Sequence, residues 1–378
     1  MTQVATKKYR LAYLSPEPNR EGHASYTHVH EIVRHLRDIG WQVDLFCPDY
    51  EQSRLPGALS RVAGIARSLT LIIFRRQPDI YYMRWHFAAW PLALWAKIGG
   101  VPTVVEVNGP IDDLFIAWPH TRRFKAFFSW LMKSQLNWSD AVVAVTPGLV
   151  SLSKKICGEE KFVSLIPNGA NTDVFSPEAA KEVNGLTEIL PRRFLIFFGT
   201  MARWQGIRTI LEAIEEPAWP AGMHVVFAGD GEDREFVEMA AERLDHVHYY
   251  GRVPYQTLAT IVARATGALV CPENLEGRAV TGLAPLKLFE SLSSGVPVIA
   301  TNQPFQAELI REENCGIVIE PGQPEVLANA VSKLVESEDQ RLKWSENARR
   351  VVVQSHSWLA RAKDTDSVLQ AVLSFKAT

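Results

Sequence analysis

The sequence of 378 residues has few cysteines, and no pattern among them suggests a cross-link or a metal site. Its four cysteines are widely separated and form no CxxC pair. Disulfide-stabilised secreted proteins and zinc proteins use closely spaced cysteines or histidines instead. We therefore expect reduced thiols in a cytoplasmic protein, at Cys47, Cys157, Cys271 and Cys315.

Long hydrophobic runs are also missing. The longest, residues 69–74 and 85–96, are shorter than the about 20 apolar residues that a membrane-spanning helix needs. The first residues, MTQVATKKYRLAYLS, lack the apolar centre of a signal peptide. These absences predict a cytoplasmic protein, with a peripheral position on the inner face of the membrane as the alternative.

Several nucleotide and metal motifs are absent as well. No GxGxxG follows a predicted strand and no GxxxxGK[ST] occurs, which argues against a dinucleotide-dependent oxidoreductase and a P-loop NTPase. No DxD-type pair stands in the context of a metal site. The adjacent acids Asp112 and Asp113 are interpreted as solvated loop acids or a helix N-cap. We expect no bound metal and no cofactor.

Short apolar runs, by contrast, recur throughout the chain and alternate with helical patterns. Continuous apolar runs are typical of strands that are buried on both faces of a parallel sheet. Six of these runs precede residue 175, namely 10–15, 41–47, 79–83, 103–107, 141–145 and 162–166. Six more lie at 193–199, 224–229, 246–250, 267–272, 297–301 and 316–320. Helical patterns fall between them, for example at 28–39, 207–215, 232–244 and 325–336.

Twelve strands exceed one small sheet, so the chain is predicted to be α/β with two Rossmann-like domains facing across a cleft. A stretch rich in Pro, Gly and charge, residues 174–193, separates the two sets of strands. We expect an N-terminal domain at 1–185 and a C-terminal domain at 190–355. A helix at 356–378 is expected to cross back to the N-terminal domain.

The segment from Pro272 to Thr301 places a helix directly after a strand. The helix is predicted to start at Pro285 and to stop near Gly295. The free N–H groups of a helix start suit an anion, and Lys287 lies in this first turn, where a cation alone is unfavourable. Lys287 and Glu290 share one helix face, so a solvated surface ion pair is the alternative to a ligand site.

The run PLKLFESLSSGVPVIAT resembles the donor-binding signature of the family 4 retaining glycosyltransferases of GT-B fold. Further segments resemble that family in the same order along the chain. They are EGHASYTHVHEIVRHLRDIGWQVDLF at 21–46, TVVEVNGP at 103–110, VTPGLVSL with IPNGANTDVFSP at 166–177, GTMARWQGIRTILEAI at 199–214, AGDGED at 228–233 and YYGRVPYQTLATIVARA at 249–265.

The resemblance implies a retaining, metal-independent glycosyltransferase of the hexosyltransferase type that uses a UDP- or GDP-type nucleotide sugar. It implies that Glu290 binds the ribose and that the backbone before it contacts the diphosphate. Phosphate cations would come from Arg203 and Lys287. The donor-binding positions are Gly22, Arg203, Gln205, Gly206, Arg252, Val253, Pro285, Leu286, Lys287 and Glu290.

Three positions depart from the common family pattern. Gly282 stands where many relatives carry a first glutamate, Gln205 where many carry lysine, and Asn108 where many carry histidine. An asparagine can hydrogen-bond but cannot serve as a base. A non-catalytic nucleotide-sugar-binding relative and a GT-B nucleotide-sugar epimerase are therefore the alternative functions.

Candidate catalytic residues follow strands of the first half. Glu106 and Asn108 flank Val107 at a strand end, and a buried glutamate needs partners, whether in a site or in a structural hydrogen bond. Arg84 and His23 are further candidates, each with a structural alternative. His28 and His30 are two apart on a predicted helix and are interpreted as passive.

The first half of the chain is also the basic half. Residues 1–175 contain 20 Lys and Arg but 15 Asp and Glu, while the whole chain has net charge −2. Basic and apolar residues mix at 53–77 and 119–133, a pattern of segments that lie on anionic membranes or of an ordinary solvated face. A nucleotide-sugar donor and an unidentified acceptor (glycan, lipid-linked or small molecule) are expected partners, and nucleic acid is not.

Overall fold

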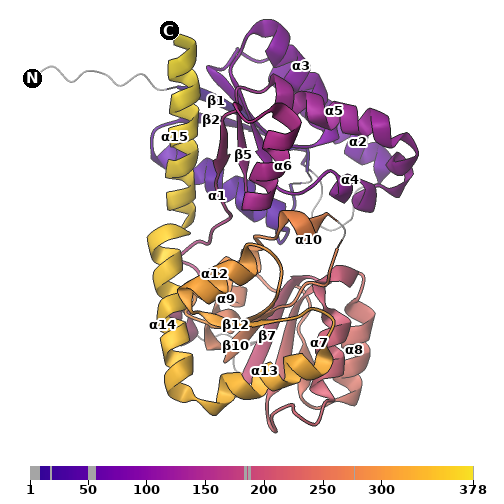
Figure 1. Cartoon of the computed structure of the whole chain (residues 1–378), viewed down its shortest axis with the longest axis vertical. Coiled ribbons are helices and arrows are strands. Elements are labelled where there is room, and N and C mark those ends of the chain that lie inside the picture. The colour runs from indigo at the N-terminus through magenta and orange to yellow at the C-terminus, as the bar shows by residue number, and fades with distance from the viewer. Residues whose placement is uncertain are drawn as a thin grey trace, which may run out of the picture. The chain divides into compact units, whose positions relative to one another are not determined.

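The structure, a computed structural model, describes residues 9–17, 19–49, 57–182, 185, 189–275 and 277–377, and the chain forms two compact units (Figure 1). Unit 1 contains the described residues up to Glu21, then Ser25–Pro167 and the residues from Leu359 onward. Unit 2 contains Gly22–Ala24 and Asn168–Trp358. Within the described residues, no helix is both long enough and apolar enough to cross a membrane.

Unit 1 is built around a six-stranded parallel sheet with the order β2-β1-β3-β4-β5-β6. Its strands are β1 (Arg10–Leu14), β2 (Gln42–Phe46), β3 (Ile80–Arg84), β4 (Thr103–Val107), β5 (Ala141–Ala144) and β6 (Val163–Leu165). Every residue of β3, β4 and β5 is buried, which is why these strands read as continuous apolar runs. All six strands expected in this half are confirmed.

Helices flank this sheet, and local sequence explains several of their ends. Pro147 and the Thr146 side chain, which accepts the Leu149 N–H at 3.2 Å, start one helix, and Gly100 with φ 65° ends another. The helices are α1 (Ala24–Asp38), α2 (Ala58–Phe74), α3 (Trp90–Gly99), α4 (Asp112–Ala117), α5 (Lys125–Trp138), α6 (Pro147–Cys157) and α15 (Trp358–Ala377), with 3-10 turns η1 (Phe87–Ala89) and η2 (Pro119–Phe124). Asp112 and Asp113 form the first turn of α4, and Ile111 is its N-cap.

The C-terminal helix α15 packs on unit 1. The indole N–H of Trp41 donates to Asp366 at 2.7 Å, and Lys376 lies 3.2 Å from Asp140. Leu369 and Val372 are buried on the same helix. The last segment of the chain therefore completes the first unit.

Unit 2 is built around a second six-stranded parallel sheet, with the order β12-β11-β10-β7-β8-β9. Its strands are β7 (Phe194–Thr200), β8 (His224–Asp230), β9 (Val247–Tyr249), β10 (Gly267–Val270), β11 (Val298–Thr301) and β12 (Gly316–Ile319). The six strands expected in the second half are confirmed too. Counted from its first strand, the sheet has the order of the dinucleotide-binding folds.

Helices cover both faces of the unit 2 sheet (Figure 1), and two hydrophobic clusters lie beneath them. The helices are α7 (Ile207–Ile214), α8 (Arg234–Arg243), α9 (Tyr255–Arg264), α10 (Arg278–Thr281), α11 (Leu286–Ser293), α12 (Gln306–Glu313), α13 (Pro324–Glu336) and α14 (Glu338–Ser355), with 3-10 turns η3 (Pro177–Lys181) and η5 (Arg203–Gln205). All eight residues of α11 are buried.

The chain enters unit 2 earlier than the expected linker at 174–193. The crossing lies between Pro167 and Asn168, and the chain returns to unit 1 after Trp358. The physical reason is Phe175, which is fully buried in a hydrophobic cluster of unit 2 together with Ala170. These apolar side chains attach residues 168–182 to the second unit, although their neighbours in sequence are polar.

Each sheet has one point where the strand order reverses. In unit 1 it lies between β1 and β3, and in unit 2 between β7 and β10. Open α/β sheets bind ligands at the carboxyl ends of the strands beside such a point. The two reversals therefore direct attention to the residues that follow these four strands.

Candidate functional site

Glu106 is the centre of a buried polar network at the carboxyl edge of the unit 1 sheet. Its carboxylate is 2% exposed on β4. Tyr82 donates its hydroxyl at 2.6 Å, Arg84 donates Nη1 at 3.0 Å, and Asn108 donates Nδ2 at 2.6 Å. The imidazole Nε2 of His28 lies 3.0 and 3.1 Å from the two carboxylate oxygens. The sequence left open whether Glu106 was paired, and the structure gives it four partners.

The network extends along β3 to the loop after β1. Arg84, 6% exposed, contacts Glu106 with one guanidinium nitrogen and lies 3.3 Å from Glu17 with another. Burial lowers the pKa of Arg84, but Glu17 and Glu106 outweigh that effect and hold it above its ordinary value. Arg84 is thus fixed between two carboxylates and remains charged.

The same charges decide the protonation of Glu106. Burial alone would raise the pKa of Glu106, but His28, Arg84 and the Tyr82 hydroxyl together hold it well below its usual range. Burial and the Glu106 charge raise the pKa of Tyr82 well above its ordinary value. At neutral pH the network therefore holds an ionised carboxylate and a neutral phenol.

Two histidines in this region have different partners: His86 bonds a backbone N–H, and His28 bonds the Glu106 carboxylate. His86 accepts the Ala88 N–H at 3.1 Å, and burial lowers its pKa to about 4, so it is a neutral cap. His28 was interpreted as passive, and the structure corrects that interpretation because it bonds Glu106 from α1. The available signal was its place with Ile32 on the buried face of α1. His30, on another face, bonds Asn19 at 2.7 Å.

Gly22 and His23 lie in the turn that leads into α1. Gly22 has φ 82°, in the left-handed region that favours glycine, and no atom would crowd a Cβ there. His23 is half-buried. The conformation of Gly22 fits its interpretation as a turn residue, and its ligand role and the catalytic role of His23 stay predictions.

Lys287 is the principal charged group at the strand-order reversal of unit 2. It is 9% exposed in the first turn of α11, and its Nζ donates to Gln205 Oε1 at 2.8 Å. The same nitrogen lies 3.9 Å from the centre of the Phe197 ring. No ion pair of Lys287 occurs among the described residues. The interpretation of Lys287 and Glu290 as a solvated surface pair is therefore wrong, because both side chains are buried.

Burial lowers the pKa of Lys287 to about 7, although Cys271 and Glu290 act in the opposite direction. Glu290, 6% exposed, lies three residues further along the helix. A cation in the first turn of a helix is disfavoured by the helix dipole, and burial adds to the penalty. An anion bound beside Lys287 would offset both costs.

The start of α11 has open hydrogen-bond donors. Pro285 is the N-cap, rather than a residue of the first turn, and makes no side-chain cap hydrogen bond. Among the described residues, none accepts a hydrogen bond from the backbone N–H of Leu286 or Lys287. These donors and the Lys287 ammonium together form an arrangement suited to phosphate oxygens.

Glycines let the loops at this edge approach each other closely. A Cβ on Gly206, which has φ 75°, would lie 2.0 Å from the carbonyl oxygen of Cys271. Only glycine therefore permits the loop after β7 to touch the end of β10. Gln205 is buried beside Gly206. The close approach of Gly206 to Cys271 brings Gln205 within hydrogen-bond distance of Lys287.

Arg203 and Arg252 follow β7 and β9 and form exposed ion pairs. Arg203 is 79% exposed and lies 3.3 Å from Glu232. Arg252 lies 3.6 Å from Asp230, at the end of β8. Val253, next in sequence, is partly buried against the hydrophobic core. The carboxyl edge of this sheet thus carries two exposed cations in addition to the buried one, Lys287.

Gly282 has a structural reason for departing from the family pattern. It has φ 80°, and a Cβ there would lie 2.7 Å from the carbonyl oxygen of Pro304. A glutamate at this position would require the loop before α11 to move. The backbone therefore accounts for the missing acid.

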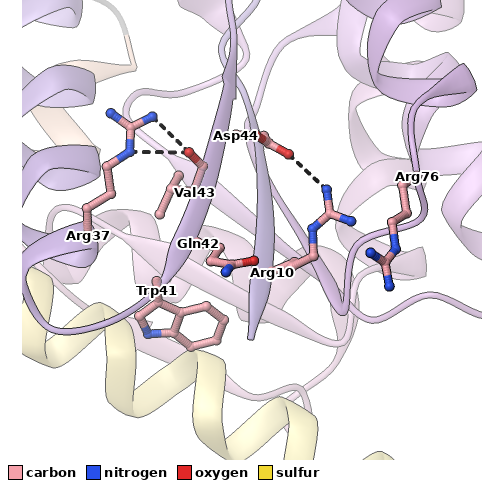
Figure 2. A pocket seen from close by; sticks show the side chains of 7 residues that line it. All are labelled: Arg10, Arg37, Trp41, Gln42, Val43, Asp44 and Arg76. Atoms are coloured by element: carbon pink, nitrogen blue, oxygen red, sulfur yellow. Dashed lines mark hydrogen bonds and ion pairs between the residues drawn. The ribbon is translucent and has the colours of Figure 1, made fainter. Parts of the chain in front are cut away.

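A surface pocket shown in Figure 2 lies away from these residues. It is lined by Arg10, Arg37, Trp41, Gln42, Val43, Asp44 and Arg76. It lies at the amino ends of β1 and β2, and the Glu106 network lies at the carboxyl edge. Its Arg10 and Arg37 already bond Asp44 and the Val43 carbonyl. No group of three His, Cys, Asp or Glu residues in the described chain has the arrangement of a metal site.

Two family models match the chain, one in each half. Residues 26–174 match the model described as Glycosyltransferase Family 4, and residues 180–351 match Glycosyl transferases group 1. The matched ranges contain the Glu106 network and the Lys287 site respectively.

Curated relatives are similar over part of their length. D-rhamnosyltransferase WbpZ of Pseudomonas aeruginosa is 26% identical over 219 residues, which cover 58% of this chain and 56% of that protein. The GDP-mannose-dependent alpha-(1-6)-phosphatidylinositol monomannoside mannosyltransferase of Mycobacterium tuberculosis is 24% identical, and the match covers 72% of each chain. The chain thus spans little more than half of WbpZ.

Solved structures share the fold over almost the whole chain. Sucrose-phosphate synthase from Thermosynechococcus elongatus has a TM-score of 0.76 at 15% identity, covering 98% of this chain and 100% of that one. HepE from Anabaena, solved with UDP and glucose, has a TM-score of 0.70 at 14% identity, covering 96% and 100%. The expected α/β, Rossmann-like architecture of GT-B type is thereby confirmed.

Proposed function

Since the chain joins a glycosyltransferase family 4 domain to a group 1 glycosyl transferase domain, we propose that it transfers a sugar from a nucleoside-diphosphate sugar to an acceptor. The donor binds at the carboxyl edge of the unit 2 sheet. Its diphosphate lies at the start of α11, and Glu290 binds its ribose.

The observation that carries this proposal is the buried Lys287 beside open N–H donors. Among the described residues, the Lys287 ammonium contacts the Gln205 amide and the Phe197 ring, and its burial costs free energy that the nearby Glu290 does not fully offset. A diphosphate would supply the missing negative charge and accept from the helix N-terminus. An anion bound there would offset the cost of burying this cation, which supports the proposal.

The chemistry requires charge stabilisation on the departing diphosphate. Preorganised cations and N–H dipoles achieve this where charge develops in the transition state. Lys287 and the α11 N–H groups are fixed in place, whereas Arg203 and Arg252 are exposed and can reorient. We propose that these protein groups serve in place of a metal ion and that no cofactor is used. Retention of the anomeric configuration is proposed from the family resemblance.

The Glu106 network is proposed to serve the acceptor side of the reaction. Asn108 is oriented by its 2.6 Å bond to Glu106, and no described residue donates a hydrogen bond to its side-chain oxygen, which can therefore accept one. Glu106 itself is enclosed by donors and positions its neighbours. Arg84 is likewise fixed, and His23 is the accessible candidate near the start of α1.

The donor nucleotide is proposed to be UDP or GDP. HepE was solved with UDP, and the Mycobacterium relative is named for its dependence on GDP-mannose. Both are diphosphates, which is the chemistry that the start of α11 suits. A non-catalytic nucleotide-sugar-binding relative or an epimerase remains the second candidate, because Asn108 cannot act as a base.

A membrane position on the inner face is proposed from the helices of unit 1. Helices α2, α3 and α5 and turn η2 contain no Asp or Glu. Their exposed apolar residues include Leu59, Phe74, Ile98, Phe124, Phe127 and Trp130. Arg122, Arg123 and Lys125 lie among them, and residues 53–56 of the expected 53–77 patch lie outside the described residues. Basic residues interleaved with apolar ones suit an anionic lipid surface.

A ligand screen by thermal shift tests the donor proposal. We expect UDP or GDP, and the corresponding nucleotide sugars, to raise the melting temperature. Glu290→Ala is expected to abolish the shift, whereas Glu242→Ala, on the exposed face of α8, is expected to preserve it.

The proposal fails if no nucleotide diphosphate or nucleotide sugar stabilises the protein, or if Glu290→Ala responds like Glu242→Ala. Incubation with donor alone then separates the activities. An epimerase converts the sugar without an acceptor, a non-catalytic relative leaves it intact, and a transferase shows slow donor hydrolysis.

A further inference from the structure

The helix α11 is held at both ends by the segment through which the chain enters unit 2. This entry segment is residues 168–175, and the continuous part of unit 2, Asn168–Trp358, begins with its first residue. The Asn168 side-chain amide donates at 2.6 Å to the carbonyl of Ala284, which precedes the N-cap Pro285. At the other end, the Ser293 hydroxyl donates at 2.6 Å to the carbonyl of Phe175.

Arg349 on α14 reinforces the second of these contacts. Its Nη1 donates to the carbonyls of Ser293 at 2.7 Å, Phe175 at 3.1 Å and Thr172 at 3.2 Å. A guanidinium at the carboxyl end of a helix also interacts favourably with the helix dipole. One arginine thus ties the end of α11 to the entry segment.

The exit segment, residues 356–358, contacts the same helix. The His356 ring lies 5.1 Å from the Phe289 ring of α11. The Ala170 N–H donates to the His356 carbonyl at 3.0 Å, and the Trp358 N–H donates to the Ala170 carbonyl at 3.1 Å. The entry and exit segments are therefore bonded to each other, and both contact α11.

We propose that Asn168, Ser293 and Arg349 are positioning residues that couple diphosphate binding at α11 to the entry and exit segments. The proposal rests on the proposed function, because it requires the diphosphate to bind at the start of α11. Backbone donors act only within hydrogen-bond distance, so a small shift of the helix weakens them. By linkage, a bound diphosphate then stabilises the arrangement of both segments to the same degree.

Binding measurements on three single variants test the coupling. We expect Asn168→Ala and Ser293→Ala to raise the dissociation constant for UDP or GDP about fivefold each, the effect of one net hydrogen bond. Asn329→Ala is the matched control, because its amide donates to the Glu325 carbonyl at 2.9 Å on α13. It should leave the dissociation constant unchanged. If Asn168→Ala does not fold, Ser293→Ala decides, because Arg349 still bonds the Phe175 carbonyl.

Amide hydrogen exchange provides a readout that a purely structural role would not change. Adding UDP or GDP to the wild-type protein should slow exchange at Ala170 and Trp358, and less so in Asn168→Ala. The coupling is overturned if the nucleotide binds but Asn168→Ala and Ser293→Ala match Asn329→Ala, or if exchange at these two amides does not respond. If no nucleotide binds to the wild-type protein, it is the proposed function that fails.

Discussion

Both units bury a charged side chain near the carboxyl edge of their sheet, but they satisfy that charge differently. In unit 1, Glu106 has four hydrogen-bond partners, including the charged Arg84. In unit 2, the contacts of the Lys287 ammonium among the described residues are the Gln205 amide and the Phe197 ring, which carry no net charge, and the Glu290 charge acts on it without forming an ion pair. Glu106 is thus paired with an opposite charge within the protein, whereas Lys287 forms no ion pair among the described residues.

The difference indicates which charge belongs to the framework and which to a ligand site. A buried ion with full partners stabilises the fold only as long as every partner remains. A buried ion without a counter-charge destabilises the fold, and its retention needs another reason. Measured stabilities should therefore change in opposite directions when the two charges are removed.

The largest effect is expected from Glu106→Gln. It removes the charge while Arg84 and His28 stay buried, so the free energy of unfolding should fall by about 3–5 kcal/mol in urea titrations. The control Glu159→Gln, an exposed residue 3.5 Å from Lys154, should change it by less than about 1 kcal/mol.

The pH dependence of this variant has a defined sign. The folded protein holds the pKa of Glu106 below its ordinary value of 4.5, so the stability that its charge provides is present above that value and is lost as pH falls. The gap between wild type and Glu106→Gln should therefore narrow in acid. A gap below about 1 kcal/mol at neutral pH would mean that the network is dispensable, and a larger gap that stays constant in acid would mean that the Glu106 charge is not its source.

Lys287→Met is expected to act in the opposite direction. The pKa of Lys287 falls to about 7 from 10.5, so the unfolded chain binds more protons than the folded one between these values. Wild-type stability should then rise with pH by up to about 1.4 kcal/mol per unit over this range, relative to the variant. Near pH 7 the variant should be the more stable protein by urea unfolding. A less stable variant would show that Lys287 belongs to the framework.

The fold could be predicted from the sequence because apolar runs and their spacing report burial directly. All twelve strands lie where the runs predicted them, since β3, β4, β5 and β10 are buried along their whole length. The entry into unit 2 could not be located in this way. Phe175 and Ala170 attach the entry segment to a hydrophobic cluster whose other members lie far away in sequence.

The candidate site could be predicted only in part. Lys287 and Glu290 could be identified from a short motif. Their burial could not be predicted, because it depends on how α11 packs on the sheet. The helical pattern of α1 could have predicted that His28 is buried, but not that its partner is Glu106, because the two residues are 78 positions apart. Likewise, the sequence shows only that Gly282 replaces the glutamate of the family pattern. Its φ of 80° shows that the backbone favours glycine there.

The affinity for a diphosphate should depend on pH through Lys287, and the dissociation constant should change by up to about tenfold per pH unit. Because burial lowers the pKa of Lys287 to about 7, raising the pH above that value makes it neutral before the anion binds. UDP or GDP should bind more weakly at pH 8.5 than at pH 6, with proton uptake, in calorimetric titrations in two buffers. His86, with a pKa of about 4, does not titrate in this window. Lys287→Met should bind weakly and without this pH dependence, and a pH-dependent variant would contradict the assignment.

The smallest effects are expected from the exposed pair of Arg203 and Glu232. Changing each residue tests whether exposed charges at the carboxyl edge of the unit 2 sheet contribute to nucleotide binding. Both side chains are more than two-thirds exposed, at 79% and 68%, so neither Arg203→Gln nor Glu232→Gln should change the unfolding free energy by more than about 0.5 kcal/mol.

The effects of these two variants on nucleotide binding should have opposite signs. Arg203→Gln removes a cation and should raise the dissociation constant for UDP or GDP about two- to fivefold, whereas Glu232→Gln removes a competing anion and should lower it slightly. Both changes should shrink at high salt, because exposed charges are screened, while the effect of the buried Lys287 persists. If the two variants change binding in the same direction, Arg203 is an ordinary surface residue and the fixed cation acts alone.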